Sequence, residues 1–292
     1  MLRIVTYNIQ FSRGRDQRYD LARVADAVRD ADIIALQEVE RFWDRSGNTD
    51  QPMLLGELLP HHYWVYGPSI DVLKQFGPDP VGAARRQFGN MVLARFPILS
   101  SRNHLLPRTA FLPIRSIQRA AIETVVQLAD GRLIRVTSTH LDHLSTSLRI
   151  EQCQTLVNMH RSSPLEGNVE HGPASAPLWQ EALHPPVPPA DHIVLGDFNM
   201  EPSSPEYDVM VGDLHPRHGR LNRLDGFADA WVLAGNDEEA GASFYLDATK
   251  RLGIRIDYGF VSAGLVPAVR RTWIDEDAVG SDHQPCWTEL DL

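Results

Sequence analysis

Seven side chains suited to metal or acid–base chemistry lie directly beside short apolar runs of the chain. They are Asn8 after "RIVTY", Glu38 after "IIALQ", His140 after "IRVTST", Asp197 and Asn199 in "HIVLGDFN", and Asp282 and His283 before "QPCWTEL". Apolar runs of this length predict buried strands, and α/β proteins build their sites at strand ends along one edge of a sheet. We therefore expect these side chains to share one site.

Carboxylate and amide oxygens without a cluster of cysteines favour a hard cation such as Mg²⁺ or Mn²⁺. The histidines are too far apart in the sequence to form a short zinc signature, which disfavours zinc. A magnesium ion beside histidine is typical of phosphoryl chemistry. Taken singly, Asn8 also fits a turn, Glu38 a helix N-terminus, Asp197 an Asx-turn and His140 a structural role. Their joint occurrence favours a site.

The elements that must position these residues begin with a strand, a helix and a strand. Residues 2–9 predict the first strand, residues 19–31 an amphipathic helix capped by Asp20, and residues 32–40 a second, buried strand. A further helix around residues 52–59 and a strand at 62–66 lead into a segment rich in glycine and proline. We expect that segment, at about residues 67–89, to be irregular.

The rest of the chain predicts antiparallel strands, one longer helix and a second irregular excursion at about residues 161–190. The helix covers residues 145–160, and Asp130-Gly131 predicts a hairpin turn. The expected strands are residues 90–95, 98–106, 116–128, 133–141, 192–197, 255–261, 268–274 and 284–290, and the expected short helices are 204–210 and 227–235. This distribution favours one domain over residues 1–292, with two packed sheets flanked by helices.

Composition indicates an ordinary globular core, because hydrophobic residues make up 43% and charged residues 23% of the 292 residues. We expect a cytoplasmic monomer without a secretory signal or a membrane-spanning segment. Cys153 and Cys286 lie far apart and predict buried free thiols. The formal net charge of −10 gives no overall attraction to a polyanion, although local cations or bound metal can reverse the field within a site.

Six short motifs occur in order along the chain: "TYNI", "LQEV", "THLD", "GDFN", "RIDY" and "SDHQP". The series resembles that of the endonuclease/exonuclease/phosphatase superfamily, which has the DNase I-like fold. The resemblance extends from Asn8 to His283. It implies a four-layer α/β sandwich, with two packed mixed β-sheets flanked by helices, and a phosphoesterase that uses Mg²⁺ or Mn²⁺.

The resemblance also implies a role for each acid near the metal. Glu38 of "LQEV" matches the main metal carboxylate, and Asn8 of "TYNI" matches a residue beside the metal and the phosphate. Asp282 of "SDHQP" matches the residue that completes the acidic cluster around the metal.

Five further residues match catalytic positions of the superfamily. Asp197 resembles the residue that orients or deprotonates the attacking water, and Asn199 resembles the one that holds the phosphate or the nucleophile. His140 and His283 resemble the histidines on either side of the scissile phosphate, and Asp257 matches the acid that orients His283. The sequence leaves open which group protonates the leaving group and whether one or two metals take part.

Two residues are candidates for substrate binding: Arg119, in a predicted strand, and Asp142, which follows the His140 motif. Each also fits a structural role. Asp229 begins a short predicted helix, which favours N-capping.

We expect the substrate to be a phosphodiester that is hydrolysed at a P–O bond by in-line attack of activated water. The alternatives are a nuclease acting on DNA or RNA, and a phosphomonoesterase of a phosphoinositide-like or sugar-phosphate substrate. The acidic balance favours a small phosphodiester or a lipid headgroup, but Lys74, Arg85 and Arg86 leave a nucleic-acid backbone open. A catalytically silent binding module would have lost a metal or water-positioning residue, and none is missing.

Overall fold

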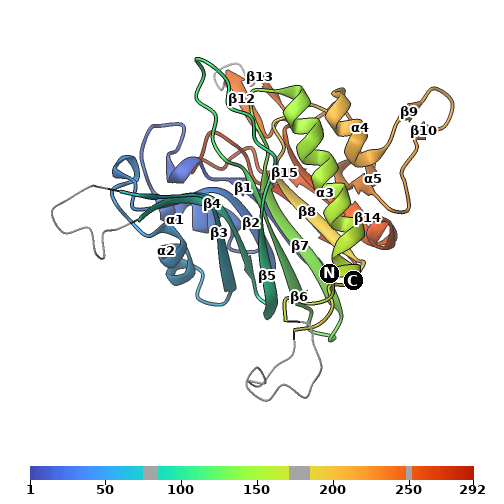
Figure 1. Cartoon of the computed structure of the whole chain (residues 1–292), viewed down its shortest axis with the longest axis horizontal. Coiled ribbons are helices and arrows are strands. Elements are labelled where there is room, and N and C mark those ends of the chain that lie inside the picture. Colours follow the sequence, from blue (N-terminus) through green and yellow to red (C-terminus); the bar gives the residue numbers. More distant parts are fainter. Residues whose placement is uncertain (75–84, 171–184, 248–251) are drawn as a thin grey trace.

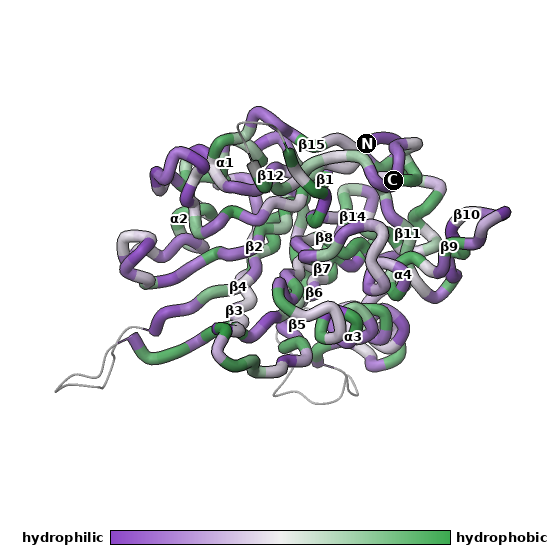
Figure 2. The backbone as a smooth tube through the Cα atoms, turned by 90° about the horizontal axis from the view of Figure 1, so that it is seen from above, coloured by the Kyte–Doolittle hydropathy of each residue, from purple (hydrophilic) through white to green (hydrophobic). Residues whose placement is uncertain are grey.

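The computed structural model describes residues 1–74, 85–170, 185–247 and 252–292 (Figure 1). Two six-stranded β-sheets pack face to face, and helices cover the outer face of each. Figure 2 shows α1 and α2 on one side of the strands and α3 and α4 on the other. The predicted four-layer α/β sandwich is therefore confirmed. Within the described residues, no helix combines the length and apolar character that crossing a membrane requires.

The first sheet has the strand order β15-β16-β1-β2-β4-β3. Its strands are β1 (Leu2–Asn8), β2 (Ile33–Arg41), β3 (Tyr63–Leu73), β4 (Arg85–Ala94), β15 (Val269–Ile274) and β16 (Cys286–Leu290). Strands β1 and β2 are parallel, and the other pairs are antiparallel.

The second sheet has the order β11-β14-β8-β7-β6-β5 and is also mixed. Its strands are β5 (Ile98–Leu105), β6 (Ala120–Gln127), β7 (Leu133–His140), β8 (His192–Asp197), β11 (Phe227–Asp229) and β14 (Asp257–Ser262). Only β7 and β8 pair in parallel. The predicted Asp130-Gly131 turn joins β6 to β7, and Gly131 has the positive φ of 86° that such turns require.

The remaining described elements are helices, short 3₁₀ turns and two small hairpins. The helices are α1 (Leu21–Val28), α2 (Gln51–Leu58), α3 (Thr146–Glu166), α4 (Pro205–Val211) and α5 (Ala230–Leu233). The 3₁₀ turns are η1 (Gln10–Ser12), η2 (Asp44–Ser46) and η3 (Ala263–Ala268), and the hairpins are β9 (Leu214–His215) with β10 (Gly219–Arg220) and β12 (Phe244–Asp247) with β13 (Leu252–Ile254). Asp20 caps α1 and Asp229 caps α5, as predicted.

Alternation along the strands produces the layers. On β1, Ile4 belongs to the core between the two sheets, whereas Val5 packs with α1 and α2 on the outer face. On β8, Ile193 faces the first sheet and Val194 packs towards α3 and α4. Every second side chain of these strands therefore points into the space between the sheets.

The expected irregular excursions differ from the structure at their ends. Residues 67–73 and 85–89 belong to β3 and β4, and residues 161–166 extend α3. Gly67 and Pro68 interrupt the apolar pattern, but they lie where the β3–β4 register shifts at a bulge, a position that tolerates both residues. Residues 167–170 and 185–190 are irregular, as expected, whereas 75–84 and 171–184 lie outside the described residues.

The predicted helix at residues 227–235 also begins with a strand, because residues 227–229 form β11 at the edge of the second sheet.

Gly89 of β4 lies where both neighbouring strands bulge. The β2–β4 register shifts between Leu36 and Val39, and the β3–β4 register shifts between Pro68 and Ile70. A Cβ atom on Gly89 would lie 2.2 Å from the Gly67 carbonyl oxygen, so only glycine fits this close approach.

Candidate active site

Three strands of the second sheet bring polar residues into one row at the edge of the sandwich. In the strand register, His140 at the end of β7 pairs with Asp197 at the end of β8, and Asp197 pairs with Asp257 at the start of β14. Their side chains continue the inward-facing positions of their strands, and Asn8 does the same on β1 of the facing sheet. The alternation that builds the core thus also aims these groups at one another.

Gly196 allows the close approach on which this row depends. A Cβ atom there would lie 2.1 Å from the Thr139 carbonyl oxygen of β7. The following Phe198 is buried in the core against Tyr258 and Phe260, with which it makes edge-on ring contacts. Phe198 therefore points into the core, away from the polar row.

Glu38 reaches the site through a β-bulge. Regular alternation would place it with Ile34 and Leu36, which pack on the helix side of the first sheet. Strand β2 carries one extra residue just after Leu36, and Glu38 has a φ of 59°. The bulge turns the Glu38 carboxylate inward, where its Oε1 accepts a hydrogen bond from Asn8 Nδ2 at 3.3 Å.

Asp197 lies at the centre of the cluster. Its Oδ2 accepts a hydrogen bond from Asn8 Nδ2 at 2.9 Å and lies 3.3 Å from His140 Nε2 and 3.7 Å from His283 Nε2. Its Oδ1 accepts the backbone N–H of Asn199 at 2.9 Å. One buried carboxylate therefore contacts four of the predicted site residues.

Asp257 holds His283 through Nδ1, the ring nitrogen that does not face Asp197. Its Nδ1 lies 2.8 Å from Asp257 Oδ2, and its ring packs on Phe244 at 4.9 Å between centroids. Asp257 is itself fixed, because its backbone N–H donates to Ser243 Oγ at 3.0 Å. The predicted pairing of Asp257 with His283 is thus present in the structure.

Asn199 lies beside His140. Its Nδ2 lies 3.0 Å from His140 Nε2 and donates to the Leu141 carbonyl oxygen at 3.1 Å. Asn199 has a φ of 50°, a left-handed conformation that asparagine tolerates better than most residues. Glu38 and Asn199 thus share a left-handed backbone conformation that few non-glycine residues of the described chain adopt.

The two histidines are in opposite charge states. Burial, together with the nearby positive charge of Arg119, lowers the pKa of His140 well below its usual value, so this ring is neutral. Burial also lowers the pKa of His283, but the carboxylates of Asp257 and Asp197 outweigh it and raise that pKa to about 10. Burial raises the pKa of Asp197 to about 6, against the opposing effect of cationic His283.

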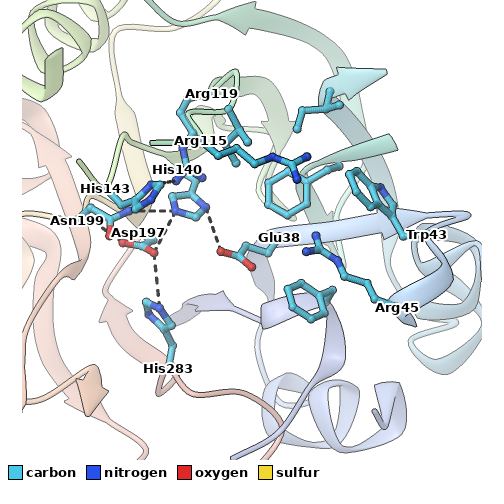
Figure 3. Close-up of a pocket in the computed structure, with 14 residues that line it drawn as sticks. Glu38, Trp43, Arg45, Arg115, Arg119, His140, His143, Asp197, Asn199 and His283 are labelled. Atoms are coloured by element: carbon cyan, nitrogen blue, oxygen red, sulfur yellow. Dashed lines mark hydrogen bonds and ion pairs between the residues drawn. The ribbon is translucent and has the colours of Figure 1, made fainter. Parts of the chain in front are cut away.

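The cluster forms one end of a cavity of about 430 Å³ (Figure 3). Glu38, His140, Asp197, Asn199 and His283 line this end.

The other end is lined by residues that the sequence did not point to. Phe11, Trp43, Arg45 and Arg115 stand out among them. The only sequence signal for Trp43 and Arg45 is their place just after "LQEV", within "ERFWDR".

Arg119 lies between these two ends. It is buried and lines the cavity, and its Nη2 lies 3.1 Å from Nδ1 of His143, another cavity residue that the sequence did not single out. Among the described residues, the Nε and Nη1 of Arg119 have no hydrogen-bond partner. Arg119 therefore keeps two buried donors without a partner at the wall of the cavity.

Comparison with known proteins agrees with this geometry. The sequence profile of the Endonuclease/Exonuclease/phosphatase family matches residues 5–283. The chain belongs to this family. None of the curated proteins matches it significantly.

Solved structures of the endonuclease/exonuclease/phosphatase family share the fold. A family member from Bacteroides vulgatus is 18% identical, with a TM-score of 0.67 and coverage of 100% of this chain and 98% of that one. A member from Beutenbergia cavernae is 21% identical, with a TM-score of 0.63 and coverage of 100% and 71%. The 3′ phosphatase NExo from Neisseria, bound to a product DNA hairpin, is 18% identical, with a TM-score of 0.58 and coverage of 100% of both chains.

Members of the endonuclease/exonuclease/phosphatase family are phosphoester hydrolases and generally depend on a divalent metal. The protein is accordingly a phosphoester hydrolase.

The site residues fit a divalent metal of the kind that the family uses. Ligand atoms of Asp197, Asp257 and His283 lie within 4.8 Å of one another, and Asp257 Oδ2 and His283 Nδ1 are joined by a hydrogen bond. Carboxylate oxygens of Glu38 and Asp197 remain on the cavity side, which suits a hard cation. The buried Nδ1 of His140 has no hydrogen-bond partner among the described residues and lies 3.9 Å from Glu38 Oε1.

Four of the predicted site residues do not line the cavity. Asn8 and Asp257 nevertheless contact the cluster, through Asp197 and His283, whereas Asp142 and Asp282 make other contacts. The Asp142 carboxylate accepts the backbone N–H groups of Leu144 and Ser145, both at 2.9 Å, and so supports the turn before α3. Asp282 accepts a hydrogen bond from Gln10 Nε2 at 2.5 Å. Neither residue lines the cavity.

The basic residues that left a nucleic-acid backbone open are largely neutralised. Lys74 pairs with Asp44 at 3.0 Å and Arg85 pairs with Asp71 at 2.6 Å. Arg86 instead lies over the Trp43 ring, 4.7 Å from its centroid.

Proposed function

We propose that the protein is a Mg²⁺- or Mn²⁺-dependent phosphodiesterase that hydrolyses a P–O bond by in-line attack of water. The observation that supports this most directly is the position of the Asp197 carboxylate. It lies between neutral His140 and cationic His283, at the end of a cavity that also contains Glu38. An acceptor for a proton and a fixed positive charge are both required when water attacks a phosphate.

The chain's own residues divide this work among them. Asp197 orients the water and accepts its proton, and Asn199 helps to hold the nucleophile or a phosphoryl oxygen. His283, held as a cation by Asp257, stabilises the negative charge that develops on the phosphoryl oxygens. His140, which is neutral, lies on the Asn199 side of Asp197 and contacts the phosphate there.

Glu38 and Asn8 are the residues that would hold the metal. Arg119 adds a positive charge that attracts the phosphate. When bound, the metal withdraws charge from the phosphoryl oxygens and promotes ionisation of water. Asp282 has a more distant role in this proposal, because it anchors Gln10 and so supports the turn that follows Asn8. Asp142 likewise acts through the turn that carries His143.

The cavity favours a diester over a monoester. It continues past the reactive cluster to Trp43 and Arg45, which leaves room for a second ester substituent. A nuclease is the second candidate, because three arginines, Arg45, Arg86 and Arg115, lie around this far end. A neighbouring structure, the Neisseria 3′ phosphatase, holds a product DNA hairpin.

The test is hydrolysis of bis-p-nitrophenyl phosphate with Mg²⁺ or Mn²⁺, compared with p-nitrophenyl phosphate and plasmid DNA. We expect metal-dependent turnover of the diester at least about tenfold faster than of the monoester, and abolition by EDTA. Preferential nicking of the plasmid would support the nuclease instead. Absence of metal-dependent turnover on all three substrates would overturn both readings.

A further inference from the structure

The far end of the cavity has a charge that the hydrolysis step does not use. Arg45 and Arg115 line it, whereas the acids that line the cavity, Glu38 and Asp197, belong to the reactive end. Figure 3 shows both guanidinium groups pointing into the cavity on the side of Trp43. Glu40 offsets part of the Arg45 charge, whereas Arg115 has no carboxylate partner among the described residues, so the far end keeps a net positive charge that favours an anion.

Arg45 is held in place by its surroundings. Its guanidinium lies over Phe11 at 4.0 Å and over Trp43 at 4.7 Å, measured to the ring centroids. The Nε and Nη2 of Arg45 both donate to the buried carboxylate of Glu40, and Ser46 Oγ supports the second oxygen of that carboxylate at 2.8 Å. This arrangement leaves Nη1 without a hydrogen-bond partner in the described part of the chain. The side chain is thus pre-organised, which reduces the entropy lost on binding a ligand.

Arg115 comes from a different element, the loop between β5 and β6. Among residues 1–74, 85–170, 185–247 and 252–292, it forms no hydrogen bond or ion pair. Its whole guanidinium is therefore available to a ligand.

The aromatic rings at this end support the arginines rather than offer a platform for a flat ligand. Phe11 is stacked on Tyr19 and also carries Arg45. Trp43 carries two guanidinium groups, those of Arg45 and Arg86. The Trp43 Nε1–H is occupied as well, since it donates to the Gln87 carbonyl oxygen at 2.7 Å. A planar group that stacks here would have to displace these contacts.

We propose that Arg45 and Arg115 form a second phosphate subsite, so that the natural substrate carries another phosphate group beyond the one that is hydrolysed. Guanidinium groups match the geometry of phosphate oxygens and form charge-assisted hydrogen bonds with them. The substrate class is therefore a phosphoester with at least two phosphate groups. This inference rests on the proposed function, because it assigns the scissile phosphate to the reactive end.

The test compares inhibition by one and by two phosphates. Bis-p-nitrophenyl phosphate serves as the reporter substrate, and the inhibitor pairs are thymidine 5′-phosphate with thymidine 3′,5′-bisphosphate and fructose 6-phosphate with fructose 1,6-bisphosphate. The two pairs differ in the spacing of their phosphates. In the wild type we expect the bisphosphate of at least one pair to inhibit about tenfold more strongly than its monophosphate.

Arg115→Gln and Arg45→Gln should bring this ratio close to one. The ratio within each variant is the readout, because it cancels any general change in activity. Arg108→Gln is the matched control. Arg108 lies in the same loop as Arg115 but does not line the cavity, and its substitution removes one positive charge, as Arg115→Gln does. It should keep the wild-type ratio.

Two results would overturn the subsite. One is an inhibition ratio below about threefold for both pairs in the wild type. The other is an inhibition ratio that is as high in Arg115→Gln as in the control Arg108→Gln. If the reporter diester is not hydrolysed, the proposed phosphodiesterase fails, and calorimetry with the same probes in the presence of Ca²⁺ gives the ratio without turnover. Failure of the subsite and failure of the proposed function are thus distinguishable.

Discussion

Strand β7 carries a buried charged cluster on each of its two faces. On the inner face, His140 lies beside Asp197 and Asn199. On the outer face, Arg135 lies 3.4 Å from Glu123 Oε1 and 3.1 Å from His160 Nδ1. Both clusters contain histidine, a carboxylate and, with Arg119 on the inner side, a buried arginine.

The two clusters share most of the features often taken as marks of a site. Both contain histidines whose pKa is lowered by burial, and both leave buried nitrogens without a partner among the described residues. They differ in access. Helix α3 closes the outer cluster, where Arg135 also donates to the His160 carbonyl oxygen, whereas the inner cluster opens on the cavity. Burial and a shifted pKa therefore do not identify an active site unless a ligand can reach it.

The largest effect should come from Asp197→Asn in the inner cluster. We expect kcat on bis-p-nitrophenyl phosphate to fall about 10³-fold, because the variant loses the proton acceptor but keeps its shape. The melting temperature should change little. Asp225→Asn, which alters an exposed carboxylate paired with Arg223, is the control and should keep wild-type activity. A fall of less than about tenfold for Asp197→Asn would place the base elsewhere.

Glu123→Gln should show the opposite behaviour in the outer cluster. It leaves the buried charge of Arg135 without its carboxylate partner, which should cost about 3 kcal/mol of unfolding free energy. Urea denaturation measures this cost, and kcat of the folded variant should remain at the wild-type value. Glu166→Gln, at an exposed ion pair with Arg102, should cost under about 1 kcal/mol. A large loss of kcat in folded Glu123→Gln would mean that the two clusters are coupled.

Asp257→Asn should reduce kcat about 10²-fold and also alter its pH dependence. The Asp257 carboxylate helps to raise the pKa of His283 to about 10, and the reaction as proposed needs His283 protonated. Activity should therefore be retained below that pKa and lost as the pH rises through it. In the variant the alkaline limb should move to lower pH, and a pH–rate profile with an unmoved limb would argue against the cationic role.

The smallest effect concerns stability at acid pH and His160 of the outer cluster. Burial, with Arg135 nearby, lowers the pKa of His160 to about 4 from its usual value of 6.5. As the pH falls, His160 is protonated in the unfolded chain before it is protonated in the folded protein. The contribution of neutral His160 to the free energy of unfolding is therefore fully present above pH 6.5 and is lost as the pH falls towards 4. His160→Gln should reduce the slope of unfolding free energy in that window by about 1.4 kcal/mol per pH unit. The exposed His61→Gln is the control, and an equal slope in both variants would contradict the assignment.

Sequence patterns predicted the parts of this site that depend on regular alternation. Asn8, His140 and Asp197 end apolar strands, and their positions follow from strand ends meeting at one edge. The roles of Asp257 and His283 came from the motif series rather than from periodicity. Their pairing needs the chain to return through β14 and the loop before β16, which no local pattern shows.

Other parts could not be predicted because they depend on exceptions to alternation or on long-range packing. Periodicity alone would have placed Glu38 on the helix side, since a bulge has no reliable signature in one sequence. Asp142 fitted both substrate binding and a structural role in the sequence, and in the structure its carboxylate accepts two backbone N–H groups of the turn before α3. No motif or periodic pattern distinguishes Arg45 and Arg115 from the other arginines of the sequence. Only the fold brings both to one cavity.

The paired bulges around Gly89 divide the cavity wall into two parts with different freedom to change. On one side of the bulges, β1, β2 and β4 pair without a register shift as far as Leu36. This segment carries Asn8 and leads directly to Glu38. Beyond them, β3 and β4 continue to Ile70 and Phe88 in a shifted phase, and these two side chains line the cavity. Substitutions in this outer segment can reshape the pocket for a new substrate while the reactive groups keep their places. Gly89 thus lies at the junction between the strand segment next to the reactive groups and the segment that shapes the far wall of the cavity.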